Sequence, residues 1–236
     1  MTASNNNKTA VVLCSGGLDS TTLACQVAAE GYRLKLLGFD YGQRHVKELD
    51  SALFFADRLG ATFDVIDLTQ LNGLLPGSSL TTADVEVPDG HYAEETMRIT
   101  VVPNRNAMML AIAFGVAAAH GAEFVGTAVH AGDHYIYPDC RPSFIDAFRA
   151  MERLSLEGMW KVGLKAPFVN MTKGAIVRLG AKLGVPYAET WSCYKGGDIH
   201  CGSCGTCFER REAFAEAEVD DPTVYLATPD YADPRK

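Results

Sequence analysis

Short apolar, β-branched runs alternate with longer stretches of helical spacing along most of the chain. The runs predict strands at 8–14, 33–40, 62–68, 123–129 and 161–168. The longer stretches predict helices at 18–30, 44–59, 104–120, 142–158 and 172–183. Strands that alternate with helices in this way imply right-handed crossovers and a parallel sheet covered by helices on both faces. We therefore predict an α/β fold.

The pattern also divides the chain. It breaks down over 69–103, and a connection this long and irregular is often functional. We expect an α/β domain at 8–185, a cysteine-bearing segment at 186–218 and a tail at 219–236. Ligands of open parallel sheets collect at the carboxyl ends of the strands, so we expect the site in the loops that follow those ends.

Composition narrows the classes of partner. The 236 residues suit one α/β domain, and 21 Lys+Arg against 29 Asp+Glu give a formal charge of −8. Such an acidic chain has little sequence-independent attraction for a polyphosphate backbone, so we expect small ligands and no nucleic acid. The first ten residues lack an apolar signal region, and the longest uncharged apolar run, 107–119, is too short to span a bilayer. We therefore expect a cytoplasmic protein with no membrane partner.

A glycine-rich loop, Ser-Gly-Gly-Leu-Asp-Ser at 15–20, joins the first strand to its helix. Two glycines let the backbone turn sharply, and the helix N-terminus that follows offers free N–H groups to an anion. Nearby hydroxyls add donors, and Asp19 could hold Mg²⁺. The loop is neither a Walker A loop nor a G-x-G-x-x-G dinucleotide fingerprint. A plain βα turn with an N-cap is the alternative interpretation.

The whole hexapeptide resembles the pyrophosphate (PP) loop of the N-type ATP pyrophosphatases. That resemblance implies an adenine nucleotide alpha hydrolase-like fold and cleavage of ATP between its α- and β-phosphates, with an adenylated substrate. The ATP-binding residues are then Cys14, Ser15, Gly16, Gly17, Leu18, Asp19, Ser20, Thr21, Thr22, Leu23 and Ala24. The predicted catalytic residues are Ser15, Asp19, Ser20 and Lys173. Lys173 opens a helix, where it could neutralise pyrophosphate or be an ordinary solvated lysine.

Four of the seven cysteines, Cys193, Cys201, Cys204 and Cys207, fall within fifteen residues. An odd total without a secretory signal argues against a disulfide framework and for a metal site. Four thiolates satisfy tetrahedral Zn²⁺ and leave no open position, so we favour one structural zinc per chain in a small C-terminal appendage. An iron–sulfur cluster is the rival, although no Cys-Pro follows Cys207.

With both motifs placed, the chain resembles the 7-cyano-7-deazaguanine synthases of queuosine biosynthesis from about residue 10 to 214. The resemblance is carried by VVLCSGGLDSTTL, FDYGQRHVKEL, VPNRN, YPDCRPSFI, PFVNMTKGAIVRLG and TWSCYKGGDIHCGSCGTCFERREAF. One departure is Asn104, where the family would carry glycine. The resemblance implies a homodimer that uses two ATP to convert 7-carboxy-7-deazaguanine and ammonia into the 7-cyano base (preQ0), through adenylated acid and amide.

Six further residues are candidates for the substrate pocket. Arg105 and Asn106 open the predicted helix at 104–120, and Asp133, Tyr135, Asp139 and Arg141 lie just past the predicted strand at 123–129. The first two could meet a carboxylate or phosphate, or simply cap a helix. The others include carboxylates that suit a guanine edge and an aromatic ring that could stack on a base. Two other functions remain open. A tRNA-thiolating enzyme would use Cys140 to carry sulfur, and a zinc-bearing nucleotide-binding regulator would release no AMP.

Overall fold

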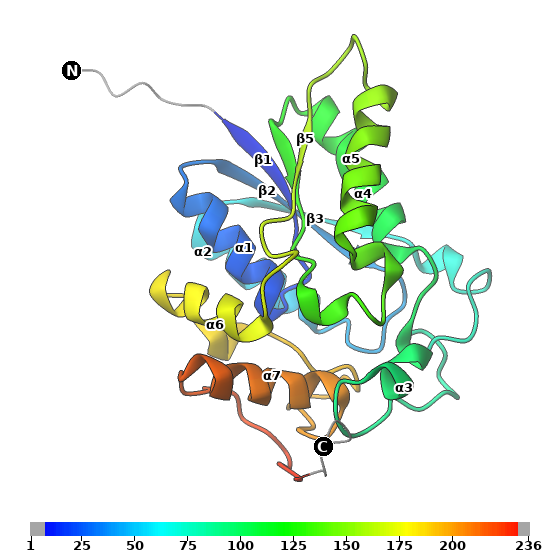
Figure 1. Ribbon diagram of the computed structural model, residues 1–236, viewed down its shortest axis with the longest axis vertical. Helices are drawn as coiled ribbons and strands as arrows, with labels where there is room; N and C mark the ends of the chain where they lie inside the picture. The colour runs from blue at the N-terminus through cyan, green and yellow to red at the C-terminus, as the bar shows by residue number, and fades with distance from the viewer. Residues whose placement is uncertain (1–7, 231–236) are drawn as a thin grey trace.

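The computed structural model describes residues 8–230, apart from the side chains of residues 94 and 95 (Figure 1). One parallel sheet of order β3-β2-β1-β4-β5 lies at its centre. Its strands are β1 (Thr9–Leu13), β2 (Arg33–Asp40), β3 (Thr62–Asp67), β4 (Phe124–Gly126) and β5 (Gly163–Lys165). All five lie within or at the bounds of the predicted strands, although β4 and β5 are three residues each. The predicted parallel α/β sheet is confirmed.

Seven α-helices surround the sheet in the described part of the chain. They are α1 (Leu18–Ala29), α2 (Glu48–Leu59), α3 (Glu94–Met97), α4 (Arg105–Ala119), α5 (Pro142–Ser155), α6 (Lys173–Lys182) and α7 (Gly205–Ala217). The five predicted helices are confirmed, but α2 begins four residues later than expected. The chain turns through Gly42 (φ +74°) before it, and the Arg44 guanidinium then donates to the carbonyls of Thr82, Ala83 and Val85.

Alternate residues of the strands build a separate core on each face of the sheet. Val12 and Leu36 pack with α1, α2, α6 and α7, whereas Val11 and Leu37 pack with α4 and α5. Figure 1 shows these two groups of helices on opposite sides of the sheet. The central strands β1, β2 and β4 are largely buried on both faces, which explains their continuous apolar runs in the sequence. The helices cover the two faces of the sheet, so the loops at the carboxyl ends of β1, β2 and β4 remain available to form a site.

Helix α4 is part of an apolar stretch that is longer than the uncharged run 107–119. The 22-residue stretch Arg98–Ala119 contains an 18-residue window with a mean hydropathy of 1.3 and is long and apolar enough to cross a membrane by length and composition. This stretch includes Arg98 and Arg105 and therefore extends beyond the uncharged run 107–119, which on its own is too short to span a bilayer. Leu110 and Phe114 of α4 are buried against the sheet, and core helices pass the same length test.

The cysteine-bearing C-terminal segment contains a helix, α7, that the sequence did not predict. Phe214 belongs to the core that α1, α2 and α6 share, and α7 lies beside α6 (Figure 1). Arg210 is 1% exposed and donates to the Tyr187 carbonyl and to the Thr190 hydroxyl. The cysteine segment is therefore continuous with the main core. Residues 231–236 of the expected tail lie outside the described residues.

Candidate active site

The glycine-rich loop turns where two elements leave no room for a side chain. Gly16 has φ +86°, and a Cβ there would lie 2.0 Å from the Glu48 carbonyl and 2.6 Å from the Ala52 nitrogen of α2. Glycine is thus required by both conformation and close approach. Gly17 is the N-cap of α1, so the first-turn amides of that helix have no acceptor within it. A helix start of this kind is a ready anion site.

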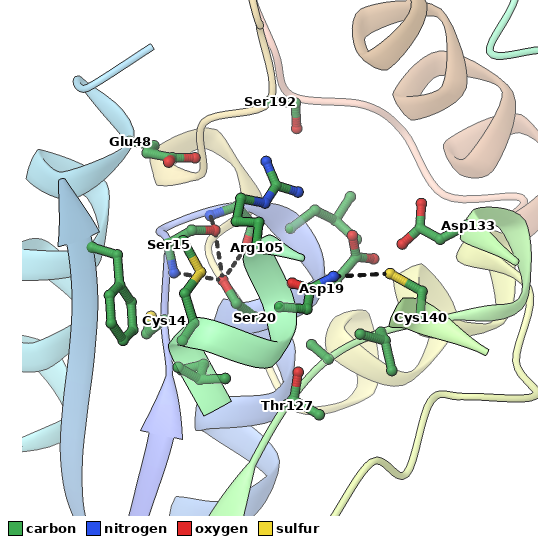
Figure 2. A pocket seen from close by; sticks show the side chains of 18 of the residues that line it. Cys14, Ser15, Asp19, Ser20, Glu48, Arg105, Thr127, Asp133, Cys140 and Ser192 are labelled. Atoms are coloured by element: carbon green, nitrogen blue, oxygen red, sulfur yellow. Dashed lines mark hydrogen bonds between the residues drawn. The ribbon is translucent and has the colours of Figure 1, made fainter. Parts of the chain in front are cut away.

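The hydroxyls of the loop hold its shape. The Ser20 hydroxyl lies 3.2 Å from the Ser15 nitrogen and donates to the Gly17 carbonyl (Figure 2). Of the eleven predicted ATP-binding residues, six line the cavity described below: Cys14, Ser15, Gly17, Leu18, Asp19 and Ser20. Gly16 shapes the backbone instead. Thr21, Thr22, Leu23 and Ala24 are buried inside α1, where they do not line the cavity.

A cavity of about 240 Å³ opens beside this loop, at the carboxyl ends of β1, β2 and β4. The wall of the cavity consists of an apolar section and a polar section. The apolar section is formed mainly by strand ends and α4: Leu13, Leu37, Phe39, Met109 and Val129. The polar section comprises Tyr41, His45, Glu48, Arg105, Tyr137 and Tyr194. The apolar section can therefore contact an apolar ring, and the polar section can form hydrogen bonds with a second ligand beside the loop.

A buried charge cluster stands against the loop. Lys173 Nζ lies 3.3 Å from Asp19 Oδ2 and 2.5 Å from Glu209 Oε2. His130 Nδ1 accepts a hydrogen bond from the Gly132 amide, so its Nε2 carries the proton and faces Asp133 at 3.4 Å. Asp19 Oδ1 is buried and has no partner among the described atoms. This orphaned oxygen at the cavity is suited to a divalent cation.

Electrostatics fix the charge state of this cluster. Burial alone would lower the pKa of Lys173, but the facing carboxylates of Asp19, Glu209 and Asp133 raise it above its ordinary value. Burial raises the pKa of Glu209, and the Lys173 cation opposes that shift. Lys173 is thus a cation at any physiological pH.

The structure brings together only half of the six further predicted residues. Arg105, Asn106 and Asp133 line the cavity. Asp139 instead accepts hydrogen bonds from the Asn106 backbone and side-chain amides, which caps the start of α4. The Tyr135 hydroxyl donates to the Tyr92 carbonyl, and the Arg141 guanidinium donates to the His134 carbonyl. These last three residues support the wall and do not line the cavity.

Asn104, which stands where the family would carry glycine, has φ +60°. Asparagine tolerates this left-handed conformation better than other side chains. Asn104 can therefore form the left-handed turn that a glycine would form before α4, and the neighbouring Arg105 lines the cavity. Its guanidinium donates to the Tyr41 hydroxyl at 3.1 Å and lies over the Tyr41 and Tyr137 rings.

Sequence reasoning missed Glu48, Glu209 and Tyr194, all of which come from segments that it assigned to other roles. Glu48 was placed in the second turn of an ordinary helix, and Glu209 lies two residues beyond a cysteine ligand. The one available signal was FDYGQRHVKEL, which follows β2 at the binding edge. Only the packing of α7 against α6 shows that Glu209 meets Lys173.

The four clustered cysteines form one ligand set. Their sulfur atoms all lie within 4.8 Å of one another. The amides of Cys201 and Cys204 donate to sulfurs of the cluster, at 3.4 and 3.3 Å respectively, which favours thiolates. Hydrogen bonds from Cys193 and Cys207 help to lower the pKa of the Cys204 thiol to about 6. The geometry fits a metal ion held by four sulfurs.

Comparison with known proteins shows the family to which the chain belongs. The family model "Queuosine biosynthesis protein QueC" matches residues 9–218. A curated relative from Ruegeria sp. (strain TM1040), "7-cyano-7-deazaguanine synthase", is 64% identical over 222 residues, covering 94% of each chain. A namesake from Brucella anthropi is 62% identical and covers 91% of this chain and 92% of its own. NMN synthetase from Francisella tularensis superimposes with a TM-score of 0.47 at 19% identity, over 76% of this chain and 63% of that one. The chain therefore belongs to the QueC family of queuosine biosynthesis proteins.

Proposed function

We propose that this chain is a 7-cyano-7-deazaguanine synthase. In this reaction the carboxylate of 7-carboxy-7-deazaguanine attacks the α-phosphate of ATP, pyrophosphate leaves, and ammonia then displaces AMP to give the amide. The amide oxygen attacks a second ATP, and loss of AMP with two protons gives the nitrile. Each nitrile therefore uses two ATP and releases two AMP and two pyrophosphate. We propose that the ammonia comes from solution.

The observation that carries the proposal is an unpaired cation beside a phosphate-binding loop. Among the described side chains no carboxylate lies within 4.0 Å of the Arg105 guanidinium. A cation in a recessed site without a counterion is suited to an anionic ligand, and a guanidinium can bind a carboxylate in two places. Arg105 would hold the substrate carboxylate, which must lie close to the loop for adenylation.

The loop and its charge cluster would bind the pyrophosphate half of ATP. Ser15, Ser20 and the first-turn amides of α1 donate to phosphate oxygens, and Lys173 offsets the charge that develops on the leaving group. Asp19, through its unpartnered Oδ1, would hold Mg²⁺. A bound Mg²⁺ would screen the phosphate charges. The apolar section would receive the adenine ring.

For the four-cysteine cluster we propose one structural Zn²⁺, held by Cys193, Cys201, Cys204 and Cys207. Four sulfurs leave no open position for a substrate. The same segment shapes the cavity: Ser192 and Thr206 line it, and Glu209 contacts Lys173. Metal binding would therefore fix the C-terminal wall of the site.

We also propose the class of substrate, the location and the oligomeric state. The acidic composition favours small-molecule substrates over nucleic acid, and the family resemblance favours a cytoplasmic homodimer. A thiolation role would need a reactive Cys140. Burial raises the pKa of that thiol, and nearby Asp133 and Asp139 raise it further. A neutral, buried thiol is a poor sulfur carrier.

The experiment is an incubation of the chain with 7-carboxy-7-deazaguanine, ATP, Mg²⁺ and ammonium, followed by mass analysis. We expect the nitrile together with AMP. A zinc-bearing nucleotide-binding regulator would instead retain ATP and release no AMP. AMP without a nitrile would indicate a different adenylating enzyme.

A further inference from the structure

One carboxyl group in the polar section has no role in the chemistry above. Glu48 begins α2, is 9% exposed and lines the cavity (Figure 2). Its Oε1 accepts a hydrogen bond of 3.2 Å from the Gln43 side-chain amide. That amide is itself fixed, because Gln43 Nε2 also donates to the Phe39 carbonyl and Gln43 Oε1 accepts from the Tyr41 amide. The Glu48 carboxyl is therefore held in one orientation.

Glu48 and Arg105 carry opposite charges in one chamber without pairing. No ion pair of 4.0 Å or less joins them among the described side chains, and Figure 2 shows them entering the same cavity from α2 and α4. Glu48 contacts Gln43 and His45, and Arg105 contacts Tyr41. Both groups thus keep hydrogen-bonding capacity for a ligand that has donors at one edge and an anion at another.

We propose that Glu48 recognises the substrate base, accepting hydrogen bonds from the N1–H and 2-amino groups of 7-carboxy-7-deazaguanine while Arg105 binds its 7-carboxylate. This inference rests on the proposed function. The base has two adjacent N–H donors at its pyrimidine edge and one carboxylate on its pyrrole ring. A carboxylate and a guanidinium are the groups that complement these two features.

Other carboxylates near the cavity are already engaged. Asp133 accepts a hydrogen bond of 2.8 Å from the Tyr92 hydroxyl and faces His130. Asp139 is taken up by Asn106 and lies outside the cavity. Adenine matches the Glu48 carboxylate less well than 7-carboxy-7-deazaguanine does, because the pairing edge of adenine has one donor next to an acceptor.

The electrostatic environment of Glu48 agrees with this assignment. Burial raises the pKa of Glu48 to about 8, although the Arg105 charge and the Gln43 hydrogen bond act in the opposite direction. The ionised form lacks the donors that water would supply. A ligand that offers two N–H groups supplies those donors.

The test compares the natural acid with its analogue that lacks the 2-amino group. In the wild type we expect KM for the analogue to exceed that for the acid by about 10- to 100-fold, the usual range for a bidentate contact. Glu48→Gln preserves the shape of the protonated side chain, so it should fold. It should raise the KM of the acid by a similar factor, leave the KM of ATP unchanged and abolish the preference for the 2-amino group.

Two further variants separate the outcomes. Glu48→Asp retains the carboxylate and should keep part of the preference, whereas Asp133→Asn, which removes the rival carboxylate, should keep all of it. If Glu48→Gln discriminates as strongly as the wild type, the inference is wrong and the proposed function stands. If the wild type releases no AMP with either compound, the proposed function itself fails.

Discussion

Lys173 is predicted to serve both the stability of the fold and the reaction, and the two roles can be separated. The change Lys173→Met removes the cation that lies between Asp19 and Glu209. Breaking a buried ion pair costs about 3–5 kcal/mol when the partner charge stays behind. The three side chains are still 12–20% exposed, so solvent screens part of this loss and we expect about 2–3 kcal/mol.

For a chain of this size each kcal/mol lowers the melting temperature by about 2–4 °C, so Lys173→Met should melt about 4–12 °C below the wild type. Its rate of AMP release should fall by about 10²–10³, because charge stabilisation at the leaving pyrophosphate is lost. Thermal unfolding and a nucleotide assay measure the two effects.

The control is the double variant Lys173→Met with Glu209→Gln. Removing the stranded carboxylate should restore a large part of the lost stability, since fewer uncompensated charges remain buried. Activity should stay low, because nothing replaces the cation at the phosphates. Recovery of both stability and rate in the double variant would refute a catalytic role for Lys173 and leave it a structural counterion.

Three other predictions concern the loop, the metal and pH. Gly16→Ala must displace α2 and adopt φ +86°, so it should lower the free energy of unfolding by about 2–4 kcal/mol. The control Gly31→Ala adopts φ +88° but has no atom within 4 Å of the added Cβ, so it should lower that free energy by about 1 kcal/mol. Cys204→Ser should lose the bound metal and melt earlier, as measured by elemental analysis and circular dichroism, and stoichiometric iron with sulfide in the wild type would contradict the zinc proposal. Because the pKa of Glu48 rises from 4.5 to about 8 on folding, the folded chain keeps a proton that the unfolded chain releases. Wild-type stability should therefore fall relative to Glu48→Gln between about pH 4.5 and 8, by up to about 1.4 kcal/mol per pH unit, and equal pH profiles of unfolding would contradict this.

The sequence predicted those features that local patterns encode. Strands such as Thr9–Leu13 are buried on both faces, so their apolar runs are unbroken, and glycines such as Gly60 end helices in the left-handed conformation. The glycine loop and the cysteine cluster are also local, because their ligands or donors lie within a few residues of one another. The structure places the loop between β1 and α1 and brings the four sulfur atoms within 4.8 Å of one another.

What the sequence did not predict depends on contacts between distant segments. Helix α7 has almost no one-sided apolar pattern, because Arg210 is buried through hydrogen bonds to Tyr187 and Thr190. The start of α2 is delayed because Arg44 bonds to carbonyls about forty residues away. Asp139 looked like a ligand-binding carboxylate, yet it serves Asn106. No spacing rule distinguishes such a supporting role from a binding one.

The sequence contains one Ser-Gly-Gly-Leu-Asp-Ser loop, so we propose that this loop carries out both adenylations. The preformed amide provides the test. We would give the amide and ATP to the wild type and to Asp19→Ala, which lacks the carboxylate proposed to hold Mg²⁺, and quantify nitrile and nucleotides. We expect one AMP and no ADP per nitrile in the wild type and the loss of both adenylations in Asp19→Ala. The melting temperature of Asp19→Ala should fall by less than that of Lys173→Met, because Lys173 keeps its contact with Glu209. Dehydration of the amide by Asp19→Ala at the wild-type rate would contradict the account, because it would require a second ATP site.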